Sequence, residues 1–146
     1  MAELMAFVGA PYTLLVALVL AERLVELLIA QRNLRSARAR GGFIAESRSL
    51  WPMAVFQAIW LFACPLEVFL LDRPWMPSLG VPALALVGLS MALRYWAVAT
   101  LGDRWNIRIV IVPGASLVTD GPYRFVRHPN YLALMVETVA LPLVHS

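Results

Sequence analysis

The sequence predicts an all-α protein, a polytopic bundle of transmembrane helices with three full spans and a short or truncated fourth segment. Of the 146 residues, 61% are hydrophobic and 14% are charged, which is far more apolar than an ordinary soluble domain. The apolar residues gather in runs of roughly the ~20 residues that a helix needs to cross a bilayer. The basic residues are all arginines, and most of them lie between those runs. We therefore treat residues 1–146 as one membrane domain.

The first predicted span covers residues 11–29. This segment is apolar until Glu22, Arg23 and Glu26. At ~1.5 Å per residue it is long enough to cross a hydrocarbon core of ~30 Å. No Lys or Arg precedes it in the sequence, unlike the positively charged start of a cleaved signal peptide. We expect the segment to remain in the protein, with the N-terminus on the external face.

An arginine-rich loop is predicted from Gln31 to Ser49. Gly41 and Gly42 should break any helix that continues from the membrane. Basic loops are retained in the cytoplasm, so the positive-inside rule places this loop there. We expect it chiefly to fix the topology and to contact anionic lipid headgroups. Against the single acid Glu46, its basic residues are Arg32, Arg35, Arg38, Arg40 and Arg48.

The second and third predicted spans are residues 50–71 and 79–101. Residues 72–77 form the short external turn between them. The fourth apolar segment, residues 131–146, is shorter than a full span and is interrupted by Pro142. This arrangement predicts that the two termini lie on opposite faces of the membrane.

Three spans return the chain to the side of the first arginine loop. The second basic loop, about residues 104–131, should therefore also lie in the cytoplasm, and the charge rule agrees for both loops. Within it, residues 105–112 are rich in β-branched side chains and roughly alternate, which favours a strand. An interfacial extended segment is an equally good interpretation. The basic residues of this loop are Arg104, Arg108, Arg124 and Arg127.

The composition argues against several other classes of protein. The basic residues flank apolar spans and do not form one face, so no nucleic-acid partner is expected. Cys64 is the single cysteine of the sequence, which excludes an intramolecular disulfide. Two histidines and one cysteine this far apart lack the spacing of a metal site, so we expect no metal.

The densest polar stretch runs from Gly121 to Tyr131, between apolar segments. Pro122 and Pro129 fix their own backbone angles and restrain the residues before them, so a shaped loop is predicted. Its arginines, His128 and two tyrosines offer charged donors, a titratable imidazole and aromatic faces. These groups suit a small zwitterionic ligand that carries an aromatic base. A basic, aromatic loop at the membrane interface is the alternative.

Two motifs in this loop resemble a known family. Gly-Pro-Tyr at residues 121–123 and Arg-His-Pro-Asn-Tyr at residues 127–131 resemble the cofactor loop of the isoprenylcysteine carboxyl methyltransferase family, integral membrane enzymes that use S-adenosylmethionine. Arg-Gly-Gly at residues 40–42 is similar to the bacterial branch of that family. The resemblance implies S-adenosylmethionine as cofactor and a bacterial inner membrane as the location. Family members usually continue through another helix to a motif with an arginine and paired acids, which nothing in this sequence matches.

The resemblance also implies which residues meet the cofactor. Ser116, Leu117 and Val118 would line its approach. Arg127 is expected either to bind the cofactor carboxylate or to hold the loop against a headgroup phosphate. The main contact surface would consist of Tyr123, His128, Pro129, Asn130 and Tyr131.

Together these expectations favour methyl transfer from S-adenosylmethionine to a lipophilic acceptor drawn from the bilayer. The acceptor is either the hydroxyl of a phenolic or polyketide lipid, which needs a nearby base, or a prenylcysteine carboxylate, which is already ionised. Such a transfer requires alignment and exclusion of water, and no catalytic triad. The alternative is a non-catalytic membrane protein, either a truncated relative or a small subunit that packs against a larger partner.

Three ionisable residues inside the predicted spans lie at similar depth. Glu22, Arg94 and Glu137 each fall about seven residues from the cytoplasmic end of their segment, or ~10 Å at ~1.5 Å per residue. Charges at that depth are costly unless they pair inside the bundle. We expect Arg94 to approach Glu22 or Glu137, and we assign Arg94 and Glu137 as candidate catalytic residues. The alternative is that each side chain reaches the surface separately.

Overall fold

The computed structural model describes residues 2–45, 51–71 and 74–145. Within these ranges the regular structure consists of four α-helices, two short turns of 3-10 helix and one two-stranded antiparallel pairing, joined by irregular loops. In chain order the elements are α1 (Ala2–Ala39), β1 (Phe43–Ile44), α2 (Trp51–Leu71), α3 (Pro77–Leu101), the 3-10 turn η1 (Gly102–Arg104), β2 (Val110–Ile111), the 3-10 turn η2 (Gly121–Arg124) and α4 (Pro129–Leu143).

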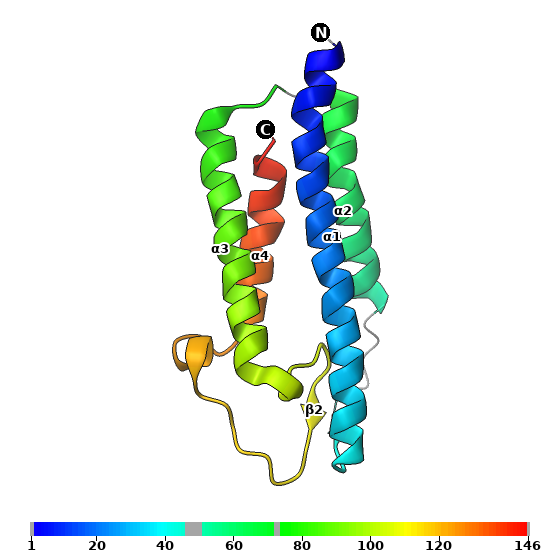
Figure 1. Cartoon of the computed structure of the whole chain (residues 1–146), viewed down its shortest axis with the longest axis vertical. Coiled ribbons are helices and arrows are strands. Elements are labelled where there is room, and N and C mark those ends of the chain that lie inside the picture. Colours follow the sequence, from blue (N-terminus) through cyan, green and yellow to red (C-terminus); the bar gives the residue numbers. More distant parts are fainter. Residues whose placement is uncertain (1, 46–50, 72–73, 146) are drawn as a thin grey trace.

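The four α-helices run side by side along the long axis of the molecule (Figure 1). α1 packs against α2, and α3 packs against α4. The first turns of α1 and the last turns of α4 lie at the same end of the bundle (Figure 1). The expectation that the termini lie on opposite faces is therefore wrong, because the short fourth segment is a helix that returns the chain to its starting end.

The second and third predicted spans are confirmed as helices. Among the described residues, two segments are long and apolar enough to cross a membrane, Trp51–Leu71 and Pro77–Arg104. The count of three full spans is not confirmed. α1 has the length, but charged residues interrupt its middle, and α4 has only 15 residues. Pro142 lies inside α4 near its end, so it shortens the helix only slightly.

α1 extends well beyond the predicted first span. Its 38 residues continue through the first part of the expected arginine loop, because Gln, Leu, Ala and Arg are good helix formers. The helix ends where Gly41 adopts a left-handed φ of 77°. The Gly42 N–H donates to Ala37 O at 2.9 Å and the Gly41 N–H to Arg38 O at 3.0 Å, the pair of bonds of a Schellman cap. The glycine pair thus stops the helix as predicted, but later than the membrane boundary.

The segment 105–112 forms a strand in part. Only Val110–Ile111 forms a strand, which pairs antiparallel with Phe43–Ile44, and the rest is irregular. The pairing ties the loop after α1 to the loop after α3. The predictions for Glu46, Arg48 and turn residues 72–73 concern positions outside the described residues.

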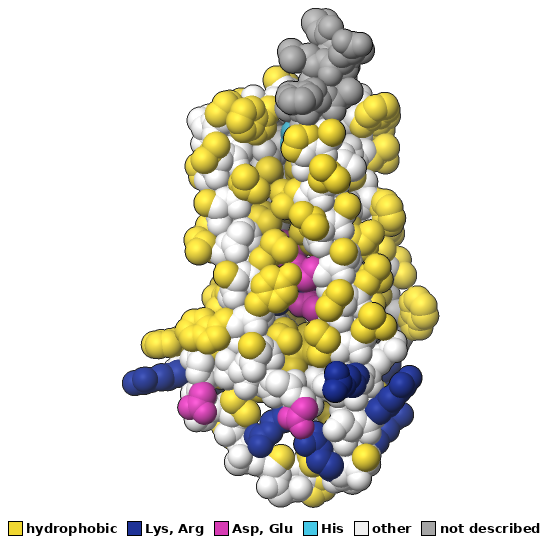
Figure 2. Space-filling model, viewed as in Figure 1, with side chains coloured by type: hydrophobic (Ala, Val, Ile, Leu, Met, Phe, Trp, Pro, Cys, Tyr) yellow, Lys and Arg dark blue, Asp and Glu magenta, His cyan; other side chains and the backbone are white. Residues whose placement is uncertain are grey.

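The surface is apolar over most of its length and basic at one end. Figure 2 shows hydrophobic side chains over the upper bundle and arginines gathered at the lower end. Large side chains such as Phe62, Phe69 and Leu89 are exposed, which is expected where a helix faces lipid. A small apolar core holds the helices together and includes Val19, Leu61, Val87, Ala140 and Leu141. We call the lower part, residues 31–45 and 102–128, the basic end.

Candidate functional site

Side chains of α1 hold the loop after α3 in place at the basic end. The Asn33 amide donates to Gly102 O at 2.9 Å and to Trp105 O at 2.8 Å. In the opposite direction, from the loop to α1, the Asn106 amide donates to Ala30 O at 3.1 Å. Gly102 and Trp105 lie at the two ends of the η1 turn, and Ala30 lies within α1, so these three bonds fix the loop against α1. The β1–β2 pairing adds a second attachment on the same side.

Two arginines organise the rest of the loop. Arg40, directly before the cap of α1, donates to the Asp103 carboxylate at 2.6 Å. Arg104 donates from Nη1 to Ser116 O at 2.8 Å. The first pair is exposed and so adds little stability, but both contacts position residues around a common hollow.

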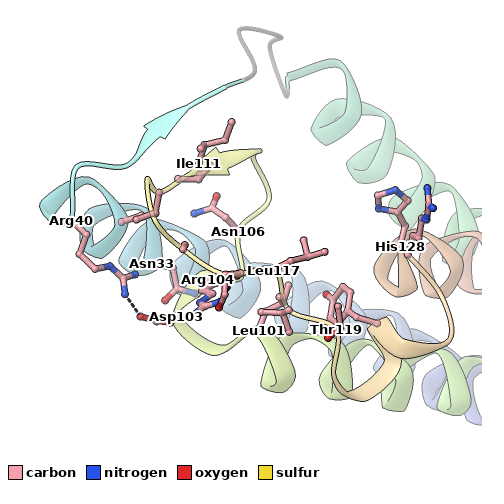
Figure 3. A pocket seen from close by; sticks show the side chains of 18 residues that line it. Asn33, Arg40, Leu101, Asp103, Arg104, Asn106, Ile111, Leu117, Thr119 and His128 are labelled. Carbon is pink, nitrogen blue, oxygen red and sulfur yellow. Dashed lines mark hydrogen bonds and ion pairs between the residues drawn. The ribbon is translucent and has the colours of Figure 1, made fainter.

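That hollow is a pocket of about 830 Å³ at the basic end (Figure 3). Of the residues that the resemblance implied, Ser116, Leu117, Val118, Tyr123, Arg127 and His128 line it. Pro129, Asn130 and Tyr131 do not line it, because they form the first turn of α4 directly behind His128. Sequence reasoning assigned no site role to the remaining lining residues, which are Asn33, Ala37, Arg40, Leu101, Asp103, Arg104, Asn106, Val110, Ile111, Val112, Ala115 and Thr119. In the sequence, the Arg-Gly-Gly motif at residues 40–42 was the signal that the end of α1 contributes to this site.

The η2 turn forms because of its glycine and proline. Gly121 has φ 58°, and a Cβ at this position would collide with the Thr100 side chain of α3. Pro122 is buried, and its carbonyl accepts hydrogen bonds from the N–H groups of Phe125 at 3.1 Å and Val126 at 3.0 Å. The turn is therefore held tightly against α3, as the two prolines of the loop predicted.

His128 and Tyr123 bring aromatic groups to the pocket. His128 is the N-cap of α4, with Pro129 at the first helical position. Its ring centroid lies 5.5 Å from that of Tyr131. Tyr123 is half-buried, and burial raises the pKa of its hydroxyl above the usual value, so this hydroxyl is a neutral hydrogen-bonding group at neutral pH. The pocket thus combines the rings of Tyr123 and His128 with the guanidinium of Arg127.

A closed ring of ion pairs lies deeper in the bundle. Arg94 of α3 contacts Glu137 of α4 at 3.2 Å and Glu26 of α1 at 3.3 Å. Arg23 of α1 donates to the same two carboxylates, at 2.7 Å to Glu137 and 3.0 Å to Glu26. Each carboxylate therefore meets both guanidinium groups. The predicted pairing of Arg94 with Glu137 is confirmed.

The predicted pairing of Arg94 with Glu22 is not found. Within the described residues neither carboxylate oxygen of Glu22 has a hydrogen-bond partner, although Glu22 is buried. Arg94 bonds instead with Glu26, one turn closer to the basic end. Sequence reasoning compared depths but not helix faces, so it missed Glu26 and Arg23, whose spacing of three residues suits an ion pair on one helix.

A layer of alanines separates this charge ring from the pocket. Ala30, Ala97 and Ala133 are each buried and lie about one helical turn from the ring, toward the basic end. Neither Arg94 nor Glu137 is among the pocket-lining residues. Their assignment as catalytic residues stays a prediction, and the ring's demonstrated contacts join α1, α3 and α4.

The fold and the site together define a class of protein, a helical membrane protein with a largely apolar pocket, edged by arginines, at its basic end. The isoprenylcysteine carboxyl methyltransferase (ICMT) family model matches residues 83–146, which include most of α3, the loop after it and α4. The chain belongs to this family of membrane methyltransferases.

Relatives extend the similarity across nearly the whole chain. The uncharacterized protein YpbQ of Bacillus subtilis (strain 168) is 34% identical over 137 residues, covering 92% of this chain and 80% of the relative. An uncharacterized protein of Haemophilus influenzae is 24% identical over 128 residues, covering 87% of this chain and 74% of the relative. No solved structure matches the chain significantly.

Proposed function

We propose that this protein transfers a methyl group from S-adenosylmethionine to a lipophilic acceptor that it takes from the membrane. The observation that carries the proposal is the pocket itself: the family's two loop motifs fold so that Tyr123, Arg127 and His128 face one cavity at the end of an apolar bundle. Family membership supports the reaction class. The lipid-facing surface of the helices supports an acceptor that is dissolved in the bilayer.

The residues present fit this cofactor. Arg127 lines the pocket and forms no ion pair within the described residues, so its guanidinium is available to a carboxylate. Tyr123 and His128 offer ring faces to an adenine. The pocket thus offers a complement to the carboxylate and to the aromatic base of such a ligand.

The chain's own part in the chemistry is alignment. The bound cofactor supplies a methyl group that is already activated on a positively charged sulfur. Arg127 and the Tyr123–His128 wall hold the two ends of the ligand, while the apolar bundle keeps water from one side of the pocket. Fixing both reactants in line provides most of the rate advantage for a transfer of this kind.

We also propose that the basic end is cytoplasmic and that the protein resides in the bacterial inner membrane. The gathering of arginines at one end supports this orientation (Figure 2). The N-terminus would then be external, and the cofactor would reach the pocket from the compartment in which it is made.

The test is methyl transfer by the purified chain in lipid nanodiscs, with S-adenosylmethionine labelled in its methyl group. Two probes separate the acceptor classes: a long-chain alkylphenol gives a base-stable ether, whereas N-acetyl-S-farnesylcysteine gives a base-labile ester. We expect label in the organic extract with one of them. Arg127→Gln should reduce the transfer, and Arg108→Gln, which removes an exposed arginine outside the pocket, should not. If the unaltered chain, Arg127→Gln and Arg108→Gln all failed to label either acceptor, the proposal would be contradicted.

A further inference from the structure

The η2 turn, taken here together with residues 125–127 that follow it, presents one side to the pocket and the opposite side outward. Tyr123 and Arg127 line the pocket, whereas Arg124 and Phe125 between them are exposed. Phe125 is 74% exposed, and the Arg124 guanidinium lies 6.0 Å from its ring centroid. An exposed aromatic ring beside an arginine is a combination that suits the interface between membrane and water.

The outward position of these two side chains is built into the fold. Gly121 packs on Thr100, and buried Pro122 accepts two hydrogen bonds from the residues that follow the turn. The turn therefore cannot fold Phe125 back into the protein without losing these contacts. Its exposure is a consequence of the same residues that shape the pocket.

The turn lies at the level where the apolar surface ends. α3 has 25 residues, ~37 Å at ~1.5 Å per residue, so Thr100 near its end falls in the headgroup region of a bilayer with a ~30 Å core. Figure 1 shows η2 beside the lower part of α3, on the flank away from α1 and α2. On the same flank in Figure 2, hydrophobic and arginine side chains protrude sideways at that height. The turn thus extends along the membrane surface.

The neighbouring surface continues this pattern. Trp96, which is exposed, precedes Thr100 by one helical turn and shares its face of α3. Trp, Phe and Arg at one level are the side chains that favour the membrane interface, where the rings sit among headgroups and the guanidinium meets a phosphate. The lipid-facing surface of α3 is therefore continuous with the outer side of the η2 turn.

We propose that the η2 turn is an interfacial anchor: Phe125 inserts into the lipid leaflet at the basic end, and Arg124 binds the phosphate of an anionic phospholipid. The contact fixes Tyr123 and the residues that lead to His128 at the membrane surface. The pocket would then open at the depth where the polar head of an amphipathic ligand lies. This contact does not depend on what the pocket binds.

Nitroxide accessibility in nanodiscs that contain anionic phospholipid tests the proposal. A spin label is placed at Phe125→Cys in a Cys64→Ala background, and collision with oxygen is compared with collision with a water-soluble nickel chelate. Phe62→Cys on α2 provides the lipid-facing reference, and Arg108→Cys provides the aqueous reference at the same end of the bundle. Because Phe125 is exposed, its substitution removes no core packing.

We expect the label at position 125 to shift toward the Phe62 reference, with oxygen accessibility exceeding nickel accessibility. Adding Arg124→Gln should move it back toward water, by up to about the fivefold change in partition that ~1 kcal/mol per arginine represents. A label at 125 that is as accessible to nickel as the one at 108 would overturn the insertion. An unchanged reading after Arg124→Gln would overturn the phosphate contact.

Discussion

Removal of Glu137 alone is expected to destabilise the bundle more than almost any other single substitution. Glu137 is 1% exposed and accepts hydrogen bonds from both Arg23 and Arg94. Glu137→Leu leaves two buried guanidinium groups with Glu26 as their one remaining ring partner. Breaking a buried pair in this way costs about 3–5 kcal/mol, because an uncompensated charge remains in an apolar environment.

The closed ring predicts that a second substitution repairs the first. Arg94→Met together with Glu137→Leu removes one positive and one negative charge and leaves the Arg23–Glu26 pair, which is intact at 3.0 Å. Replacing a buried pair with apolar groups of similar size is often close to neutral. The double variant should therefore be more stable than Glu137→Leu alone, with a coupling energy of up to about 3 kcal/mol.

The assay is unfolding of the four proteins of this cycle in mixed detergent micelles, followed by far-UV circular dichroism as denaturing detergent is increased. Arg35→Met, which removes an exposed arginine from the same bundle, is the control and should change stability by less than about 0.5 kcal/mol. If the double variant loses the sum of the two single losses, the ring is not a coupled unit and the reasoning is wrong.

Other consequences of the structure can be measured independently. Gly121→Ala should weaken cofactor binding and lower the melting temperature, since the new Cβ meets the Thr100 hydroxyl at a positive φ, and Thr100→Ala, which removes that hydroxyl, should relieve part of the loss. The raised pKa of Tyr123 predicts stability that is fully present below about pH 10 and declines above it, where only the unfolded state loses the phenolic proton, so Tyr123→Phe should flatten that decline in a pH series of melts. Asn33→Ala should speed proteolysis within residues 102–118, because two carbonyls lose their donor. A cysteine at Ser36 should react with an impermeant maleimide only after cells are opened; reaction from outside would reverse the proposed orientation.

Much of the fold followed from patterns that the bilayer and the backbone impose. Apolar length placed α2 and α3 within two residues at each end, and Gly41 with Gly42 gave the end of α1. The expectation that residues 31–39 belong to a loop was wrong, because their Gln, Leu, Ala and Arg residues favour a helix wherever they lie. The helix ends at the glycine pair.

The site was predictable where the motif is local and was missed where it depends on packing. The loop residues from Ser116 to His128 came from one continuous stretch. Asn33 and Asn106 form the other wall, but they are brought there by hydrogen bonds across α1 and the loop, which a linear pattern does not reveal. Likewise, depth alone favoured Glu22 over Glu26. The face of the helix on which a residue lies depends on its rotation about the helix axis, and small errors in the predicted helix limits obscure that rotation.

The most direct measurement of the central claim is equilibrium binding of S-adenosylmethionine to the purified chain in detergent. The protein should bind it with a micromolar Kd. His128→Ala should weaken binding by about tenfold or more, the factor that corresponds to the ~1.4 kcal/mol of one lost contact. Arg108→Gln, outside the pocket, should bind as the unaltered chain does. Absence of binding by the folded protein, or equal affinity in His128→Ala, would contradict the assignment of this pocket to the cofactor.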